Sequence, residues 1–130
     1  MIVLDASTVL EFLLDTEAGK VLAERALLPG EDLHAPHLLD VEVLQAIRRY
    51  AGLGDLDEAD SAEAVRTLVA LRIARHPHGP LLERAWELRH SLTAYDAMYV
   101  ALAEALGAPL LTRDARLARS HGHRARVLLV

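Results

Sequence analysis

The chain begins Met1-Ile2-Val3-Leu4-Asp5-Ala6-Ser7, and this stretch decides the fold. Three consecutive apolar residues are followed at once by an acid and then by residues with helical spacing. A short, wholly apolar run is typical of a strand buried on both faces, as the strands of a parallel sheet are. Ligands bind beyond the carboxyl ends of such strands. Asp5, at the end of the predicted strand, is therefore a candidate for a functional site.

The same alternation of short apolar runs and longer helical segments continues to the end of the chain, with Gly and Pro at the joints. It predicts a three-layer α/β/α sandwich around a central, mainly parallel sheet of about five strands, rich in helix. No long linker divides the sequence, so we expect a single domain over residues 1–130. We expect further strands at 33–35, 71–74, 110–111 and 127–130, and helices at 7–14, 18–28, 38–53, 57–70, 81–91, 93–106 and 115–120.

The composition excludes several classes of protein. With 52% apolar and 25% charged residues, the 130-residue chain can close a core and is not intrinsically disordered. It has no cysteine, which excludes disulfides, zinc–thiolate sites and a cysteine nucleophile. No apolar run approaches the roughly 18 residues that span a bilayer, and the N-terminus lacks the basic region of a signal peptide. We expect a cytoplasmic protein with no membrane partner.

The net charge of −5 argues against a nucleic-acid partner only if charge is spread evenly, and it is not. Residues 31–63 hold nine acids against two arginines, whereas residues 107–130 hold five arginines against one acid. One face of the protein can therefore bind phosphate although the whole chain is acidic.

Three further acids are candidates for the same site. Asp114 follows the predicted strand at 110–111, so it shares the strand-end edge of the sheet with Asp5. Glu42 and Asp96 each lie on an otherwise apolar helix face, at the i±3 and i±4 spacing of core residues. Arg49 is the main basic neighbour on the face of Glu42.

Burying an unpaired carboxylate costs several kcal/mol, so these acids are expected to share a cation. A set of oxygen ligands without cysteine selects Mg²⁺ or Mn²⁺ rather than zinc. Such an ion positions a phosphate group and activates a water molecule.

Each acid also has a purely structural interpretation. Asp5 can simply end a strand, Asp96 can form a capping box with Thr93, Asp114 can cap a short helix and Glu42 can pair with Arg49. All four acids together are harder to explain in this way, because two lie at strand ends and two on apolar helix faces.

Other motifs are weaker. We expect His76-Pro77-His78 and His121-Gly122-His123 to be exposed loop histidines, since nothing nearby completes a metal site. Ser7 and Ser91 have no adjacent base that would make a nucleophile. The scattered aromatic residues, among them Trp86, are expected to lie in the core rather than to form a base-stacking platform.

The acidic positions, taken in order, resemble the four motifs of PIN-domain ribonucleases, and more narrowly the VapC toxins of VapBC toxin–antitoxin modules. The resemblance covers essentially the whole chain. The residues that carry it are 2–7 (IVLDAS), 36–39 (PHLL) with Glu42, 93–97 (TAYDA) continuing into 99–103 (YVALA), and 111–114 (LTRD).

The resemblance implies a Mg²⁺-dependent (or Mn²⁺-dependent) endoribonuclease with Asp5, Glu42, Asp96 and Asp114 as metal ligands. It also implies a homodimer that a small VapB-like antitoxin neutralises within a larger hetero-oligomer. Hydroxyl groups that would hold the carboxylates are those of Ser7, Thr93 and Thr112. Arginines that would contact RNA phosphates are Arg113, Arg116 and Arg49.

One residue departs from the pattern, because Arg116 stands where many relatives carry a further acid or Asn. This puts a second resident metal ion in doubt. The alternative function is a catalytically silent PIN-like scaffold that binds RNA or a partner. A haloacid-dehalogenase-like phosphatase is disfavoured, since it needs a second Asp where Ser7 stands. A receiver domain is disfavoured because Asp57 lies in a turn.

Overall fold

The computed structural model describes residues 1–26 and 28–130. Their strands form one sheet in the order β3-β2-β1-β4-β5, and every neighbouring pair is parallel. The predicted sheet of about five parallel strands is confirmed. The strands are β1 (Ile2–Leu4), β2 (Leu33–Pro36), β3 (Ile73–His76), β4 (Leu110–Thr112) and β5 (Val127–Leu129).

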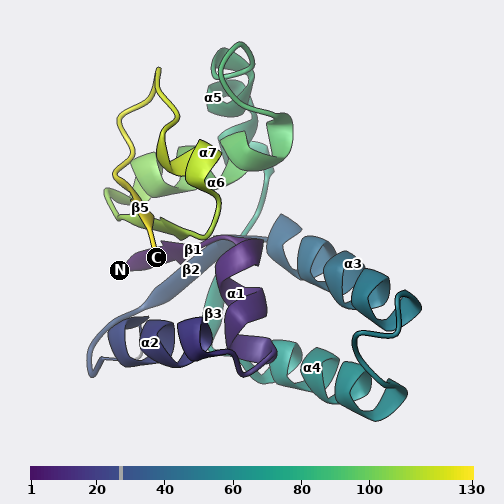
Figure 1. Cartoon of the computed structure of the whole chain (residues 1–130). Coiled ribbons are helices and arrows are strands. Elements are labelled where there is room, and N and C mark those ends of the chain that lie inside the picture. Colours follow the sequence, from purple (N-terminus) through teal and green to yellow (C-terminus); the bar gives the residue numbers. More distant parts are fainter. Residues whose placement is uncertain (27) are drawn as a thin grey trace.

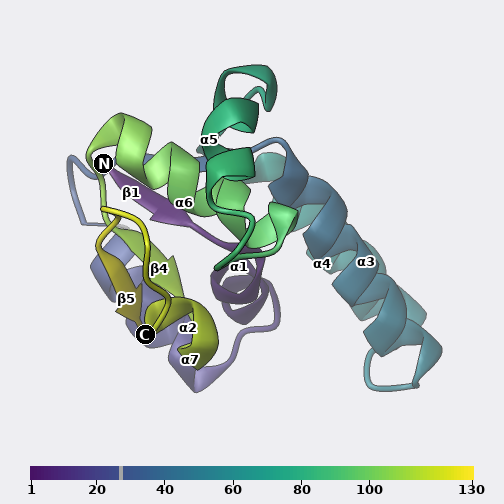
Figure 2. The ribbon, with the colours of Figure 1, turned by 90° about the horizontal axis from the view of Figure 1, so that it is seen from above.

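Helices cover both faces of this sheet, which gives the expected three layers (Figure 1). α1, α2 and α4 lie on one side and α5, α6 and α7 on the other, while α3 and α4 project together beyond the sheet (Figures 1 and 2). The α-helices of the described residues are α1 (Ala6–Leu13), α2 (Glu17–Ala26), α3 (Leu38–Gly52), α4 (Glu58–Ala70), α5 (Leu82–Glu87), α6 (Ala94–Leu106) and α7 (Ala115–Ala118).

Most predicted boundaries agree with these within two residues. The helix expected over 81–91 is shorter, because a 3-10 turn at Gly79–Leu81 precedes it and the helix ends at Glu87. The part of the expected helix 18–28 that includes residue 27 lies outside the described residues. Within the described residues, none of the helices combines the length and the apolar character needed to cross a membrane.

The strand order determines which strand ends meet at the edge of the sheet where Asp5 and Asp114 lie. The chain passes from β1 to β2 to β3 in one direction across the sheet and then returns to β4 on the other side of β1. Leu4 pairs with Leu111, so the carboxyl ends of β1 and β4 meet although more than 100 residues separate them. This is the switch point at which open α/β sheets bind ligands.

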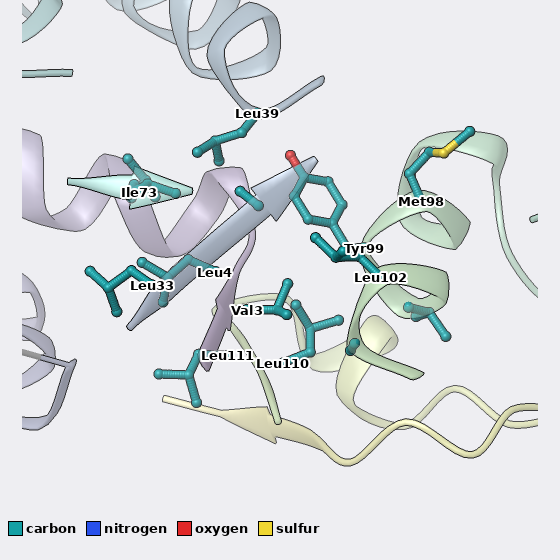
Figure 3. Close-up of a cluster of buried hydrophobic side chains, with 14 of the residues drawn as sticks. Val3, Leu4, Leu33, Leu39, Ile73, Met98, Tyr99, Leu102, Leu110 and Leu111 are labelled. Atoms are coloured by element: carbon teal, nitrogen blue, oxygen red, sulfur yellow. The ribbon is translucent and has the colours of Figure 1, made fainter. Parts of the chain in front are cut away.

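The core is continuous from the sheet into α6. Every residue from Ala97 to Ala103 is buried, since α6 packs on β1 and β2 on one side and on α5 on the other. Figure 3 shows Tyr99 reaching from α6 across the ends of the strands toward Leu39 of α3. α6 ends at Gly107, whose positive φ of 61° closes the helix in the left-handed region. A rigid, buried helix therefore carries Asp96 in its first turn.

Candidate metal centre at the strand ends

Asp5 is fixed by three hydrogen bonds immediately after β1. It is the N-cap of α1: its Oδ1 accepts from the Thr8 backbone N at 2.9 Å and from the Ser7 hydroxyl at 2.7 Å. Its Oδ2 accepts from the Thr112 hydroxyl at 2.5 Å, and the side chain is buried. These donors hold the carboxylate on both oxygens and leave it little freedom to rotate.

Asp114 reaches the same edge from β4. As the N-cap of α7, its Oδ1 accepts from the backbone N of Arg116 at 2.8 Å and of Leu117 at 3.4 Å. The Thr112 hydroxyl, which donates to Asp5, also accepts from the backbone N of Asp114 at 2.9 Å. One buried threonine thus ties the two strand-end acids together.

Glu42 comes from α3 and is positioned by Tyr99. The Tyr99 hydroxyl donates to Glu42 Oε1 at 2.7 Å, and Tyr99 itself is only 2% exposed. Burial raises the pKa of Glu42, and the charges of Asp96 and Asp5 raise it further, against the hydrogen bond from Tyr99, which lowers it. Glu42 therefore lies close enough to two other acids to be repelled by both.

Asp96 completes the group from the first turn of α6, where Thr93 is the N-cap and accepts from the Asp96 backbone N at 3.2 Å. Burial raises the pKa of Asp96, and the charges of Asp114 and Asp5 add to the increase. The hydrogen bond with the Thr93 side chain, and then the charge of Arg116, lower the pKa of Asp96 and offset part of this increase. Asp96 is thus within electrostatic reach of Asp114 and Asp5, as Glu42 is of Asp96 and Asp5.

Cations do not neutralise this cluster within the described part of the chain. There, Asp5, Glu42 and Asp96 form no ion pair, and Asp114 has only Arg116 Nε at 4.0 Å. Among those same residues, no three His, Cys, Asp or Glu side chains are arranged so as to hold an ion between them. The carboxylates share one edge and repel one another without closing around a common point.

The three predicted phosphate-binding arginines lie in different places. Arg116 is highly exposed beside Asp114. The guanidinium of Arg113 instead contacts Glu11 at 3.7 Å and donates to the carbonyl of Val130. Arg49 makes no ion pair with Glu42 within the described residues, and its guanidinium lies 5.8 Å from the centre of the Tyr50 ring.

Two hollows flank the acids. The α7 hollow, about 300 Å³, lies beside Asp96 and Asp114, and its lining is about half polar; it includes Ser91, Arg116, Arg119 and His121. The α3 hollow, about 460 Å³, lies beside Glu42 and is mostly apolar; it includes Leu10, Leu38, Val41, Tyr95 and Arg49.

Of the histidines expected in exposed loops, only His121 is exposed; His78 and His123 do lie in loops but are half-buried, and His76 lies in a strand. His76 ends β3 and its Nε2 lies 2.9 Å from His34 Nδ1. His78 Nε2 accepts from the backbone N of Leu38 at 2.8 Å, which satisfies the first N–H of α3 in place of a side-chain cap from His37. His78 thereby helps to place the helix that carries Glu42.

The aromatic residues were also predicted incorrectly in part. Trp86 and Tyr95 were expected in the core but are 68% and 61% exposed. Tyr99 is in the core, yet its hydroxyl belongs to the acidic cluster. Its signal in the sequence was its place three residues after Asp96 on the same helix face, but the sequence did not identify Glu42 as its partner.

Comparisons with known proteins show the family of the chain. The PIN-domain model matches residues 2–121. The chain belongs to the PIN-domain family. It is 46% identical over 130 residues to ribonuclease VapC12 of Mycobacterium tuberculosis, covering 100% of this chain and 99% of that protein. It is 43% identical to ribonuclease VapC1 of the same organism, covering 98% and 96%. Within the family the chain thus belongs with the VapC ribonucleases.

Solved structures share the fold. PAE2754 of Pyrobaculum aerophilum superposes with a TM-score of 0.74 at 24% identity, covering 97% of this chain and 81% of that one. VapC20 of M. tuberculosis gives 0.67 at 15% identity, covering 91% and 93%. At these identities the likeness concerns the fold, and it extends over nearly the whole chain.

Proposed function

We propose that the chain is the toxin of a type II toxin–antitoxin pair and hydrolyses RNA with a divalent metal ion held by Asp5, Glu42, Asp96 and Asp114. One observation carries this proposal: Glu42 and Asp96 are half-buried, face other acids, and have their pKa values raised by both effects. A protein gains nothing in stability from such repulsion. It is expected where a cation is to be bound.

The donor set fits Mg²⁺ or Mn²⁺, because all four groups are carboxylates and no cysteine is available. The ion would have to draw the carboxylates closer than they stand, since none of the described trios is already arranged to hold one. When bound, it would supply a polarised phosphate and an activated water molecule.

The chain's own residues would do the positioning. Thr112, Ser7 and the N-terminus of α1 hold Asp5 in one orientation. Tyr99 occupies one oxygen of Glu42 and leaves the other free for the ion or for its water. Arg116, exposed beside Asp114, would meet a phosphate oxygen of the RNA.

The partners are inferred from the relatives. Solved neighbours include a toxin–antitoxin complex from Klebsiella pneumoniae and VapBC2 from Rickettsia felis bound to a promoter DNA fragment. VapC20 is described as a toxin that cleaves the sarcin-ricin loop. For this chain we infer a cellular RNA substrate, a VapB-like antitoxin, a homodimer that joins the antitoxin in a larger assembly, and a cytoplasmic setting.

The test is cleavage of total RNA by the purified chain in Mg²⁺ and in EDTA, with sequencing of the new ends. We expect cleavage only with the metal, leaving 5′-phosphate and 3′-hydroxyl ends, and none from Asp96→Asn or Glu42→Gln. Asp55→Asn, which removes an exposed acid from the turn before α4, is the matched control and should cleave normally. Cleavage that persists in EDTA or in Asp96→Asn would overturn the proposal. Absence of cleavage by the unmodified chain would overturn it too, and is the result expected of a catalytically silent scaffold.

A further inference from the structure

The α7 hollow places two arginine side chains beside the acidic cluster. Its lining joins Asp96 and Asp114 to Arg116 and Arg119 within about 300 Å³. We propose that this hollow is the subsite for the RNA backbone next to the scissile bond, with Arg119 and Arg116 binding a phosphodiester group. This inference rests on the ribonuclease function proposed above. It adds the side of the metal centre along which the RNA strand runs.

The donors of the hollow are free to bind a ligand. Among residues 1–26 and 28–130, the guanidinium of Arg116 has a single ion-pair partner, Asp114 at 4.0 Å, and 89% of its side chain is exposed. Within the described residues, the guanidinium of Arg119 and the hydroxyl of Ser91 have no hydrogen-bond or ion-pair partner. By contrast, Arg84 and Arg75 are tied to Glu104 and Asp40 by short ion pairs.

The segment that carries Arg119 is held in place. The Ser120 hydroxyl donates to the carbonyl of Leu117 and lies 2.8 Å from His123 Nε2. Gly122 has a positive φ of 85°, and a Cβ there would approach the Ser91 hydroxyl to 3.1 Å. The backbone that presents Arg119 therefore packs against the opposite wall of the hollow, so binding a phosphate there orders little more than the arginine side chain.

The chemistry of the lining selects a phosphodiester. Guanidinium groups bind phosphate oxygens through paired N–H donors, and a neighbouring hydroxyl adds a further donor. The α3 hollow on the other flank presents mainly carbon, with Arg49 as its one arginine among the described lining residues. The anionic backbone is thus better accommodated over α7, and the α3 hollow is left for apolar contacts.

The test measures RNA binding without cleavage. Arg119→Gln is made in the Glu42→Gln chain, which we expect not to cleave, and binding of a fluorescent 15-nucleotide oligouridylate is followed in Mg²⁺ across a KCl series. The control is Arg126→Gln. It removes an exposed arginine of the same basic tail, but Arg126 lines a separate hollow with Glu104 and Gly107.

We expect Arg119→Gln to weaken binding about tenfold and to lower the slope of log K against log salt by about 0.7, the value for one phosphate contact on a single strand. Arg126→Gln should leave both unchanged. Equal losses in the two variants, no loss in Arg119→Gln, or no binding by the Glu42→Gln parent would each overturn the proposal.

These outcomes are separate from those of the nuclease test. A slope that falls in Arg119→Gln while the natural chain cleaves no RNA would keep the subsite and reject the nuclease. Metal-dependent cleavage with an unchanged slope would keep the nuclease and reject the subsite.

Discussion

Replacing Tyr99 by Phe isolates one contact of the acidic cluster. Tyr99 is 2% exposed and its ring packs in the core (Figure 3). Its hydroxyl donates to Glu42 Oε1 at 2.7 Å. The substitution removes only that oxygen and keeps the apolar ring. Glu42 then keeps its half-buried position and its acidic neighbours but loses its hydrogen-bond donor.

The size of the effect follows from the kind of bond. A hydrogen bond to a charged group contributes about 1.5–3 kcal/mol, and 1.4 kcal/mol corresponds to a tenfold change in an equilibrium constant. Because Glu42 is only half-buried, we expect the lower end of that range. Without the donor, Glu42 is less well held in its charged form, so the affinity of the metal-free protein for Mn²⁺ should fall about tenfold.

The assay is a titration of metal-free protein with Mn²⁺, with free Mn²⁺ measured by electron paramagnetic resonance. Tyr50→Phe is the matched control, because Tyr50 lies half-buried on α3 and its hydroxyl has no hydrogen bond within the described residues. It should bind Mn²⁺ as the unmodified chain does. If Tyr99→Phe retains full affinity, or if both variants lose it equally, the assignment of Tyr99 as a positioning residue for Glu42 is refuted.

Three further predictions concern stability. Without metal, Asp96→Asn should raise the melting temperature, since burial and neighbouring acids disfavour its charge. Asp5→Ala should lower the free energy of unfolding by about 1 kcal/mol, because alanine cannot cap α1 as Asp5 does. Stabilisation by both substitutions, or destabilisation by both, contradicts this. The advantage of Asp96→Asn should be complete at pH 7.5 and shrink as the pH falls through the raised pKa of Asp96, because the unmodified side chain then takes up a proton. Melting curves at pH 7.5 and 5 test this, and a constant advantage would reject the pKa argument. Glu104→Gln should cost about 3 kcal/mol in urea unfolding at pH 7, because hydrogen bonds from Arg84 lower the pKa of the buried Glu104 to about 2. That deficit should diminish as the pH falls below about 4.5 toward 2; a deficit under 1 kcal/mol at pH 7 would show that the pair is dispensable.

The sequence predicted the sheet and the acids because both depend on local patterns. The run Ile2-Val3-Leu4 followed by Asp5 defines a buried strand and its end in a few residues. Glu42 and Asp96 were identified because an acid on an apolar helix face conflicts with burial, and the conflict is visible at i±3 and i±4 spacing. That Asp5 and Asp114 share one edge of the sheet followed from the parallel architecture, whereas the pairing of β1 with β4 is seen only in the structure.

What the sequence did not reveal depends on contacts between distant segments. Tyr99 and Glu42 are 57 residues apart, and His78 reaches Leu38 from 40 residues away. No local spacing encodes such pairs. Trp86 was misplaced because apolar character alone does not decide burial, and much of a folded surface is apolar.

The sequence also did not reveal in which direction each arginine side chain points. Arg113 and Arg116 are three residues apart, yet one contacts Glu11 and Val130 and the other stands free beside Asp114. Their directions are fixed by the short helix α7 and by the strand β5 that follows it. Composition marked the tail as basic, but the packing determines which arginine faces the acids.

The most direct measurement is a crystal structure of the chain grown with Mn²⁺, with anomalous diffraction recorded at the manganese edge. We expect a strong peak in the anomalous difference map, in contact with Asp96 and Asp5 and within reach of Glu42 and Asp114. A map without a peak at this edge of the sheet at millimolar Mn²⁺, or with manganese bound only elsewhere, would contradict it.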